Sequence, residues 1–221
     1  MVNKSIDPVW EEIHSTQAWG SYPAEHIIRF VARNYYSKKR NEIKILDFGC
    51  GQGAHTWYLA REGFDTYAFD GSQSAVRKCE ERLARANLTA HLDVMDGSSL
   101  SYDSAFFDVV IDNACVYSNR IDAVEQMYKE IFRVFKPGGK LLTVVFGEEL
   151  AGYQTGKEIE PWSYKDIREG VLSGRGLTHI FTESDIKELL SRVGFSEISC
   201  DWIKYTDRGS LVHQYICCGE K

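Results

Sequence analysis

The sequence predicts an α/β fold with a doubly wound, seven-stranded, mostly parallel sheet, helices on both faces and a C-terminal antiparallel hairpin. Two observations carry this prediction. Between residues 43 and 146, short apolar segments with strand character alternate with segments of helical periodicity, the order that parallel sheets require. After residue 195, the strand-like segments 196–204 and 210–218 are separated only by a turn near 206–209.

The first strand and its turn lie in the segment ILDFGCGQG, residues 45–53, and a helix is expected over 54–64. Gly49, Gly51 and Gly53 allow backbone angles and a close ligand approach that a Cβ would block. Their spacing differs from the G-x-G-x-x-G of dinucleotide-binding loops, and the Lys-Ser/Thr of a P-loop is missing. We therefore expect a ligand against this turn, but neither NAD nor a nucleoside triphosphate.

The second unit is a strand over 66–69, then Asp70 and Gly71, then a helix over 73–86. In a doubly wound sheet, an acidic residue at the end of the second strand points into the ligand crevice and can accept hydrogen bonds from both hydroxyls of a ribose. The alternative for Asp70 is a turn or N-cap role, which Ser72 can fill equally well.

Two further segments extend the parallel part of the sheet. Residues 92–100 follow the third strand and contain Asp96 and Gly97, a pair that on its own more often marks a turn. Residues 106–118 predict a fourth, buried strand with Asn113 at its carboxyl end, where ligands of such sheets bind.

The last crossover is a helix expected over 123–135, which the sequence Lys-Pro-Gly-Gly ends at 136–139 before a strand over 140–146. A capping box from Thr182 to Asp185 predicts the start of another helix.

These ordered motifs, over residues 43–146, resemble those of the class I (Rossmann-like) S-adenosylmethionine-dependent methyltransferases of the small-molecule type. The family's first motif, hydrophobic-Asp-hydrophobic-Gly-x-Gly-x-Gly, matches Asp47 and the three glycines that follow it. The resemblance implies S-adenosyl-L-methionine as cofactor and S-adenosyl-L-homocysteine as product. It also implies that Asp96 accepts from the adenine amino group, since a carboxylate can only accept, while the amide of Gly97 meets a ring nitrogen. The cofactor-binding residues implied are Asp47, Gly49, Cys50, Gly51, Gly53, Asp70, Gly71, Asp96, Gly97 and Asn113.

The chain has 221 residues, 43% of them hydrophobic, which is enough for one domain. We expect an N-terminal helical lid (1–42), a cofactor-binding core (43–146), a substrate-side insert (147–181) and a C-terminal helix with the final strands (182–221). In the lid, Trp10, Trp19 and Tyr22 are candidates to face the sulfonium cation, because aromatic faces attract cations. The alternative is that these rings pack the helices against the sheet.

Methyl transfer from a sulfonium is an in-line displacement, so alignment supplies most of the acceleration and a base is useful without always being required. The first candidate base is His179, which precedes the helix after the insert. Its alternative is a structural histidine. Tyr117 and His14 come next, followed by Glu149.

Composition narrows the class of protein. The formal net charge is −6 and the only dense basic run is 38–40, so nucleic acid is an unexpected substrate. No apolar run of about 18 residues and no signal peptide are present, which predicts a cytoplasmic protein without a membrane segment. The six cysteines form no C-x-x-C pair, so we expect reduced thiols, neither disulfides nor zinc, and no metal.

We therefore expect a methyltransferase that acts on a small-molecule acceptor, in particular a hydroxyl of a sugar derivative or secondary metabolite. Two alternatives stay open: a protein or RNA methyltransferase that needs a partner, and a cofactor-binding subunit without transfer activity. The acceptor and the oligomeric state are left open by the sequence.

Overall fold

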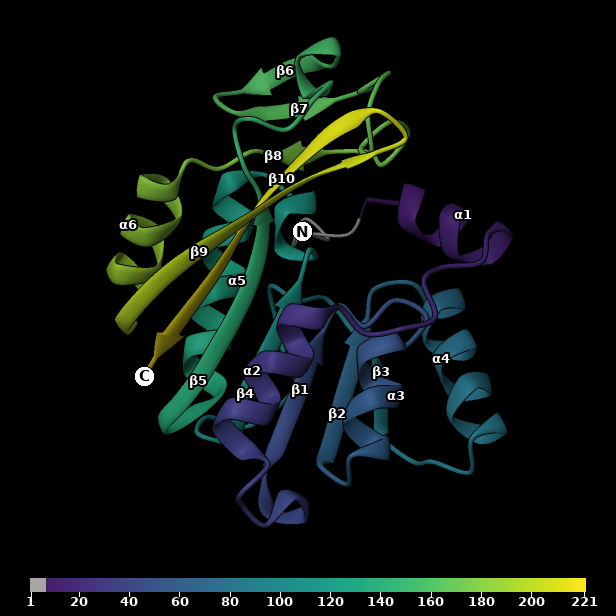
Figure 1. The fold of residues 1–221 in the computed structure, drawn as a ribbon, viewed down its shortest axis with the longest axis vertical. Coiled ribbons are helices and arrows are strands. Elements are labelled where there is room, and N and C mark those ends of the chain that lie inside the picture. The colour runs from purple at the N-terminus through teal and green to yellow at the C-terminus, as the bar shows by residue number, and fades with distance from the viewer. Residues whose placement is uncertain (1–6) are drawn as a thin grey trace.

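The computed structural model describes residues 7–221 and has one large sheet of seven strands in the order β3-β2-β1-β4-β5-β10-β9 (Figure 1). Strands β1 to β5 run parallel to one another, whereas β10 runs antiparallel to both β5 and β9. The predicted fold class is confirmed. The strands are β1 (Lys44–Phe48), β2 (Asp65–Asp70), β3 (His91–Val94), β4 (Phe107–Asn113), β5 (Phe135–Phe146), β9 (Ser196–Asp207) and β10 (Ser210–Glu220).

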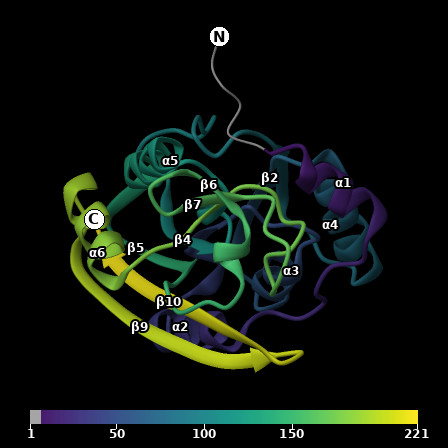
Figure 2. The ribbon, with the colours of Figure 1, turned by 90° about the horizontal axis from the view of Figure 1, so that it is seen from above.

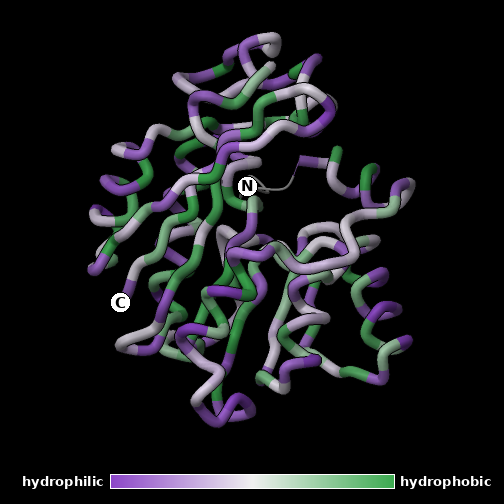
Figure 3. Tube along the Cα trace, in the orientation of Figure 1, coloured by the Kyte–Doolittle hydropathy of each residue, from purple (hydrophilic) through white to green (hydrophobic). Residues whose placement is uncertain are grey.

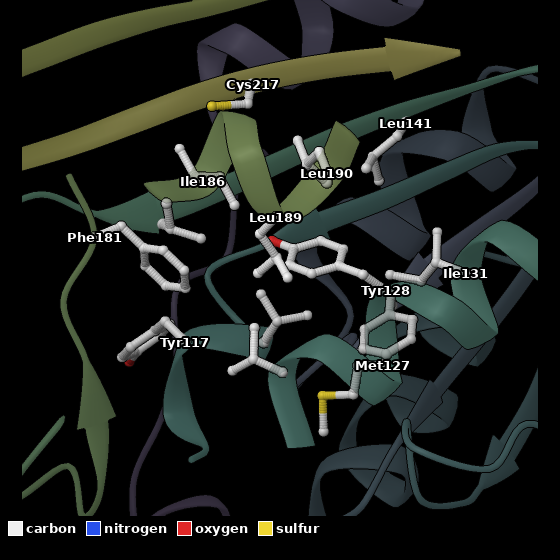
Figure 4. Packing of buried hydrophobic residues seen from close by; sticks show 14 of the residues in the cluster. Tyr117, Met127, Tyr128, Ile131, Leu141, Phe181, Ile186, Leu189, Leu190 and Cys217 are labelled. Atoms are coloured by element: carbon white, nitrogen blue, oxygen red, sulfur yellow. The ribbon is translucent and has the colours of Figure 1, made fainter. Parts of the chain in front are cut away.

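Alternation along the central strands sends successive side chains to opposite faces, and each face is covered by helices. Ile45 packs with helices α2 and α3 on one face, while the next residue, Leu46, packs with α5 and α6 on the other. Figure 4 shows the second cluster, in which Tyr128 of α5 lies against Leu189 and Leu190 of α6. The helices are α1 (Val9–Thr16), α2 (Glu25–Tyr35), α3 (Ala54–Arg61), α4 (Gln73–Arg85), α5 (Ile121–Val134) and α6 (Glu183–Val193).

The hydropathy of the chain follows this layering. In Figure 3, hydrophobic residues concentrate along the central strands, and hydrophilic ones mark the outer helices and the loops at both ends of the sheet. Within residues 7–221, no helix combines the length and the apolar character needed to cross a membrane.

Helix ends follow the local sequence. Ser72 caps α4 by accepting a hydrogen bond from the backbone N–H of Ala75. The predicted capping box at the start of α6 is confirmed, because the Thr182 side chain accepts from the Asp185 N–H and the Asp185 side chain accepts from the Thr182 N–H. The Lys-Pro-Gly-Gly segment differs from the prediction: it forms a bulge inside β5, since Phe135 already pairs with β4.

The insert contains structure that the sequence did not predict. Strands β6 (Lys157–Glu160), β7 (Ser163–Lys165) and β8 (Thr178–His179) form a second, three-stranded sheet above the large one (Figures 1 and 2). Strands of two to four residues are too short to show a period-2 pattern. The 3₁₀ helices η1 (Arg40–Glu42), η2 (Val116–Ser118) and η3 (Tyr153–Thr155) connect other elements.

The expected lid divides into two parts of different position. Helix α2 covers the sheet, with Ile27 and Val31 fully buried in the same cluster as Ile45. Helix α1 instead lies beside α4 at the carboxyl ends of the strands (Figure 1). The first six residues of the expected lid, 1–6, lie outside the described residues.

The cysteine prediction is wrong for one pair. Cys200 of β9 and Cys217 of β10 form a disulfide. The hairpin register explains it, because Asp207 pairs with Ser210 and the two cysteines each lie seven positions further from the turn, directly opposite one another. Cys50, Cys79, Cys115 and Cys218 are free thiols.

Candidate functional site

A cavity of about 440 Å³ lies at the carboxyl ends of β1, β2 and β4, where the strand order reverses around β1. Open α/β sheets bind ligands at this position. The predicted residues in its wall are Trp10, His14, Trp19, Tyr22, Gly49, Cys50, Gly51, Asp70, Gly71, Gly97, Asn113 and Tyr117. Five other predicted site residues, Asp47, Gly53, Asp96, Glu149 and His179, lie outside this wall.

The glycine turn forms the floor of the cavity. Gly49, Gly51 and Gly53 have φ values of +71°, +53° and +80°, which L side chains rarely adopt. A Cβ at Gly49 would also collide with the Cys115 side chain, and one at Gly53 with that of Cys79. Gly53 therefore shapes the turn from behind and lines no part of the cavity.

The Asp70 carboxylate is fixed beside this turn by two backbone amides. Its Oδ2 accepts from Gly51 N at 2.9 Å and its Oδ1 from Ser72 N at 2.8 Å. Burial raises the pKa of Asp70, and the hydrogen bonds from these amides counteract that rise. Each carboxylate oxygen has two acceptor sites, so each keeps one for a donor in the cavity. This arrangement suits two adjacent hydroxyls.

Asp47 lies behind the floor and its carboxyl is 1% exposed. Its Oδ2 accepts from Thr56 Oγ1 at 2.6 Å, and its Oδ1 lies 3.9 Å from His55 Nδ1. Burial raises the pKa of Asp47 to about 7. The contacts of Asp47 thus hold α3 to β1.

At the other strand ends, the structure separates the predicted pair Asp96 and Gly97 and places Asn113 in the cavity wall. Gly97 lines the cavity, but Asp96 lies outside its wall, with Oδ1 accepting from Ser98 N at 2.9 Å. Asn113 lines the cavity at the end of β4, and its Oδ1 lies 2.8 Å from His26 Nε2 of α2. Since the amide oxygen is engaged by that histidine, the amide N–H₂ is the free donor of Asn113.

Residues 7–24, here called the cover, form an aromatic wall of the cavity. The Trp19 ring packs edge-on against His14, with centroids 5.6 Å apart, and Trp10 Nε1 donates to Ser118 Oγ at 3.0 Å. Tyr22 is 82% exposed, so it lies at the rim.

Two side chains that the sequence motifs did not indicate join the cover to the floor. Gln52, inside the glycine turn, accepts from Trp19 N at 3.0 Å and donates to Gln17 O at 2.8 Å. Glu11 accepts from the hydroxyls of Ser72 and Ser74 at the start of α4, at 2.5 and 2.6 Å. Gln52 could have been noticed from its place between two of the glycines, but Glu11 belongs to no motif.

The hydrogen bonds of Gln52 also set the state of His14. Because its Oε1 accepts from Trp19, its Nε2 is the donor facing His14 Nδ1, at 3.4 Å. Burial lowers the pKa of His14, which keeps the ring neutral at pH 7. A neutral ring that accepts at Nδ1 carries its proton on Nε2. In this tautomer His14 is a hydrogen-bond donor at Nε2.

The other two predicted bases differ in position. Tyr117 lines the cavity, and burial raises its pKa far above neutral, so its hydroxyl keeps its proton. His179 is 6% exposed in β8, with Nδ1 2.7 Å from Ser163 Oγ. Burial lowers the pKa of His179 to about 4. The structure therefore corrects the placement of His179, which is held in the small sheet and lies outside the cavity wall.

Comparison with known proteins gives a consistent result. Residues 45–139 match a family model described as a methyltransferase domain. The chain is 29% identical over 103 residues to a 2-heptyl-1-hydroxyquinolin-4(1H)-one methyltransferase of Mycobacteroides abscessus, covering 46% of this chain and 45% of that protein. It is 34% identical over 104 residues to the ribosomal RNA small subunit methyltransferase C of Alcanivorax borkumensis, covering 46% of this chain and 31% of that protein. The chain thus spans less than half the length of these curated relatives.

Among solved structures, the chain is similar to a SAM-dependent methyltransferase from Methanosarcina mazei. The TM-score is 0.67 at 26% identity, and the match covers 80% of this chain and 92% of that one. The similarity extends beyond the segment that the family model matches.

Proposed function

The chain belongs to the class I S-adenosylmethionine-dependent methyltransferase family, and from this membership we propose that it transfers a methyl group from S-adenosylmethionine to a small molecule bound in the cavity. The observation that carries the proposal is the floor of that cavity. Two glycines of the turn, Gly49 and Gly51, present only backbone to the cavity beside a carboxylate, Asp70, whose remaining acceptor sites match the two hydroxyls of a ribose.

The residues present fit this cofactor. Asp70 would hold the ribose, Gly97 would lie at the adenine side, and the turn from Gly49 together with Asn113 would hold the amino-acid part. A volume of about 440 Å³ lies within the usual range of small-ligand pockets. When bound, the cofactor supplies an electrophilic methyl group on a sulfonium. The rings of Trp10 and Trp19 in the cavity wall would exclude water from that group.

The chain's own contribution to the transfer is alignment. Tyr117 and His14 both offer hydrogen-bond donors to the cavity, and neither offers a basic lone pair in the protonation state described above. A donor can orient an acceptor oxygen for in-line attack. We infer that the acceptor is a hydroxyl of a small metabolite, such as a sugar derivative or secondary metabolite, that its proton is released to solvent water as the methyl group is transferred, and that positioning provides most of the acceleration.

The first test is a calorimetric titration with S-adenosylmethionine and S-adenosylhomocysteine, with NAD as the control. Saturable binding of the first two and none of NAD is expected. Transfer of a radiolabelled methyl group is then measured over a panel of hydroxylated metabolites. Binding without any transfer would favour a non-catalytic subunit, and no binding would contradict the proposal.

A second candidate function is methylation of RNA, which the similarity to the Alcanivorax borkumensis enzyme favours. The net charge of −6 opposes it, because RNA binding relies on basic surface. Incubation with labelled cofactor and total RNA distinguishes the two: label in the RNA would support this candidate over the small-molecule one.

A further inference from the structure

One basic side chain in the cavity wall forms no ion pair within the described residues. Arg175 comes from the insert and lines the cavity, with its guanidinium carbon 4.4 Å from the ring centroid of Trp19. Its Nη1 atom is buried and has no hydrogen-bond partner within residues 7–221. The arginines that form ion pairs in that part of the chain are Arg29, Arg40, Arg77, Arg120, Arg133 and Arg192.

The cavity wall contains Asp7, Asp70 and Asp207, and none of them forms an ion pair with Arg175 within residues 7–221. Asp7 is engaged by backbone amides. Asp7 accepts from the backbone N–H of Val9 at 3.1 Å and from that of Leu177 at 3.2 Å. A buried donor without a partner costs free energy, and a buried charge costs more. A guanidinium also presents its N–H groups in a planar fork that matches a carboxylate. The site is therefore suited to an anionic group brought by a ligand.

We propose that Arg175 binds a carboxylate on the methyl acceptor, so that the substrates are organic acids; this assignment rests on the proposed function. The position of Trp19 points to the acceptor and away from the cofactor. The edge of Trp19 faces Gly51 in the floor, whereas Arg175 lies over the face of the ring. The insert also contributes Val171 and Leu172 to the wall, which suits an apolar body behind the acid group.

The test uses the full chain saturated with S-adenosylhomocysteine and titrated with 4-hydroxybenzoate or with its neutral amide. The wild type is expected to bind the acid about 10- to 100-fold more tightly than the amide, the usual effect of a charged hydrogen bond. Arg175→Gln is expected to remove this preference, and Arg175→Lys to restore part of it, because lysine keeps the charge without the fork. Arg168→Gln, an exposed position in the same insert, is the matched control and keeps the preference.

Three results would overturn the assignment: equal binding of acid and amide, no measurable binding of the acid, or a preference that persists in Arg175→Gln. Cofactor binding is measured separately with S-adenosylhomocysteine and with 5′-methylthioadenosine, which lacks the amino-acid part. If Arg175→Gln weakened only the former, Arg175 would hold the cofactor's carboxylate and the acceptor assignment would be wrong. If the wild type bound neither S-adenosylhomocysteine nor 5′-methylthioadenosine, the proposed function itself would be contradicted. Thermal unfolding of each variant shows that it is folded.

Discussion

Replacing Asp70 with alanine is expected to weaken cofactor binding by about 1–3 kcal/mol, or roughly 5- to 150-fold in Kd. The magnitude follows from the geometry. Both carboxylate oxygens are already fixed by backbone amides, at 2.9 Å from Gly51 N and 2.8 Å from Ser72 N. Each therefore offers one preoriented acceptor, and alanine leaves two ribose hydroxyls without partners in a partly dry site. Asp70→Asn keeps one acceptor oxygen and should lie between the wild type and Asp70→Ala.

The assay is calorimetric titration with S-adenosylhomocysteine, which binds without turning over. Asp65→Ala is the matched control, because Asp65 begins the same strand, at the end away from the cavity, and lines no part of the cavity. Denaturant unfolding accompanies each titration, since Asp70 also holds the glycine turn. An unchanged Kd in a folded Asp70→Ala variant would refute the ribose assignment.

Three other predictions concern positions around the cavity. Gly53→Ala should lower the free energy of unfolding by at least about 2 kcal/mol in urea titrations, because the new Cβ would collide with the Cys79 side chain. Adding Cys79→Ala should recover part of this loss. If it recovers none, the contact with Cys79 is not the cause of the loss. Burial raises the pKa of Asp47 from 3.8 to about 7, so its contribution to stability is fully present below pH 3.8 and is lost as the pH rises through 7. Asp47→Asn should therefore gain about 2–3 kcal/mol relative to the wild type between about pH 5 and pH 7.5, and a constant difference between the two proteins would contradict the shift. His179→Ala should destabilise the small sheet, because the hydrogen bond to Ser163 is lost, but the rate of methyl transfer by the folded variant should stay within about threefold of the wild type. A loss of rate of about 10²-fold or more, which is typical of a removed base, would restore His179 as a candidate base.

The floor of the site could be predicted from the sequence because it depends on strand order. Once residues 43–70 are interpreted as strand, glycine turn, helix and strand, parallel pairing brings the turn and Asp70 together at the carboxyl ends of the two strands. The same reasoning applies to Asn113, which ends the next strand.

The residues that the sequence did not indicate are positioned by the insert and the cover. Arg175 precedes a strand of two residues, so no periodicity predicts where its side chain goes. His179 belongs to that strand, and its pairing with Ser163 buries it away from the cavity. Such tertiary contacts have no local signature.

The disulfide depends on the exact register of the hairpin. The predicted turn at 206–209 sets Cys200 opposite Tyr215, whereas the observed pairing of Asp207 with Ser210 sets it opposite Cys217. The absence of a C-x-x-C pair excludes only a local motif, and the register of a hairpin brings distant cysteines together.

The links from Glu11 and Gln52 to the floor have a kinetic consequence. Under the proposed function, we expect the exchange of S-adenosylhomocysteine for fresh cofactor to lift the cover, which breaks the bonds from Gln52 to Trp19 and Gln17 and those from Glu11 to the start of α4. At about 0.5–1.5 kcal/mol for each neutral bond of Gln52, and more for those to the Glu11 carboxylate, these contacts are expected to slow the release of product without affecting the methyl-transfer step. The hydrogen bonds that keep water out of the cavity would then also limit the rate of turnover.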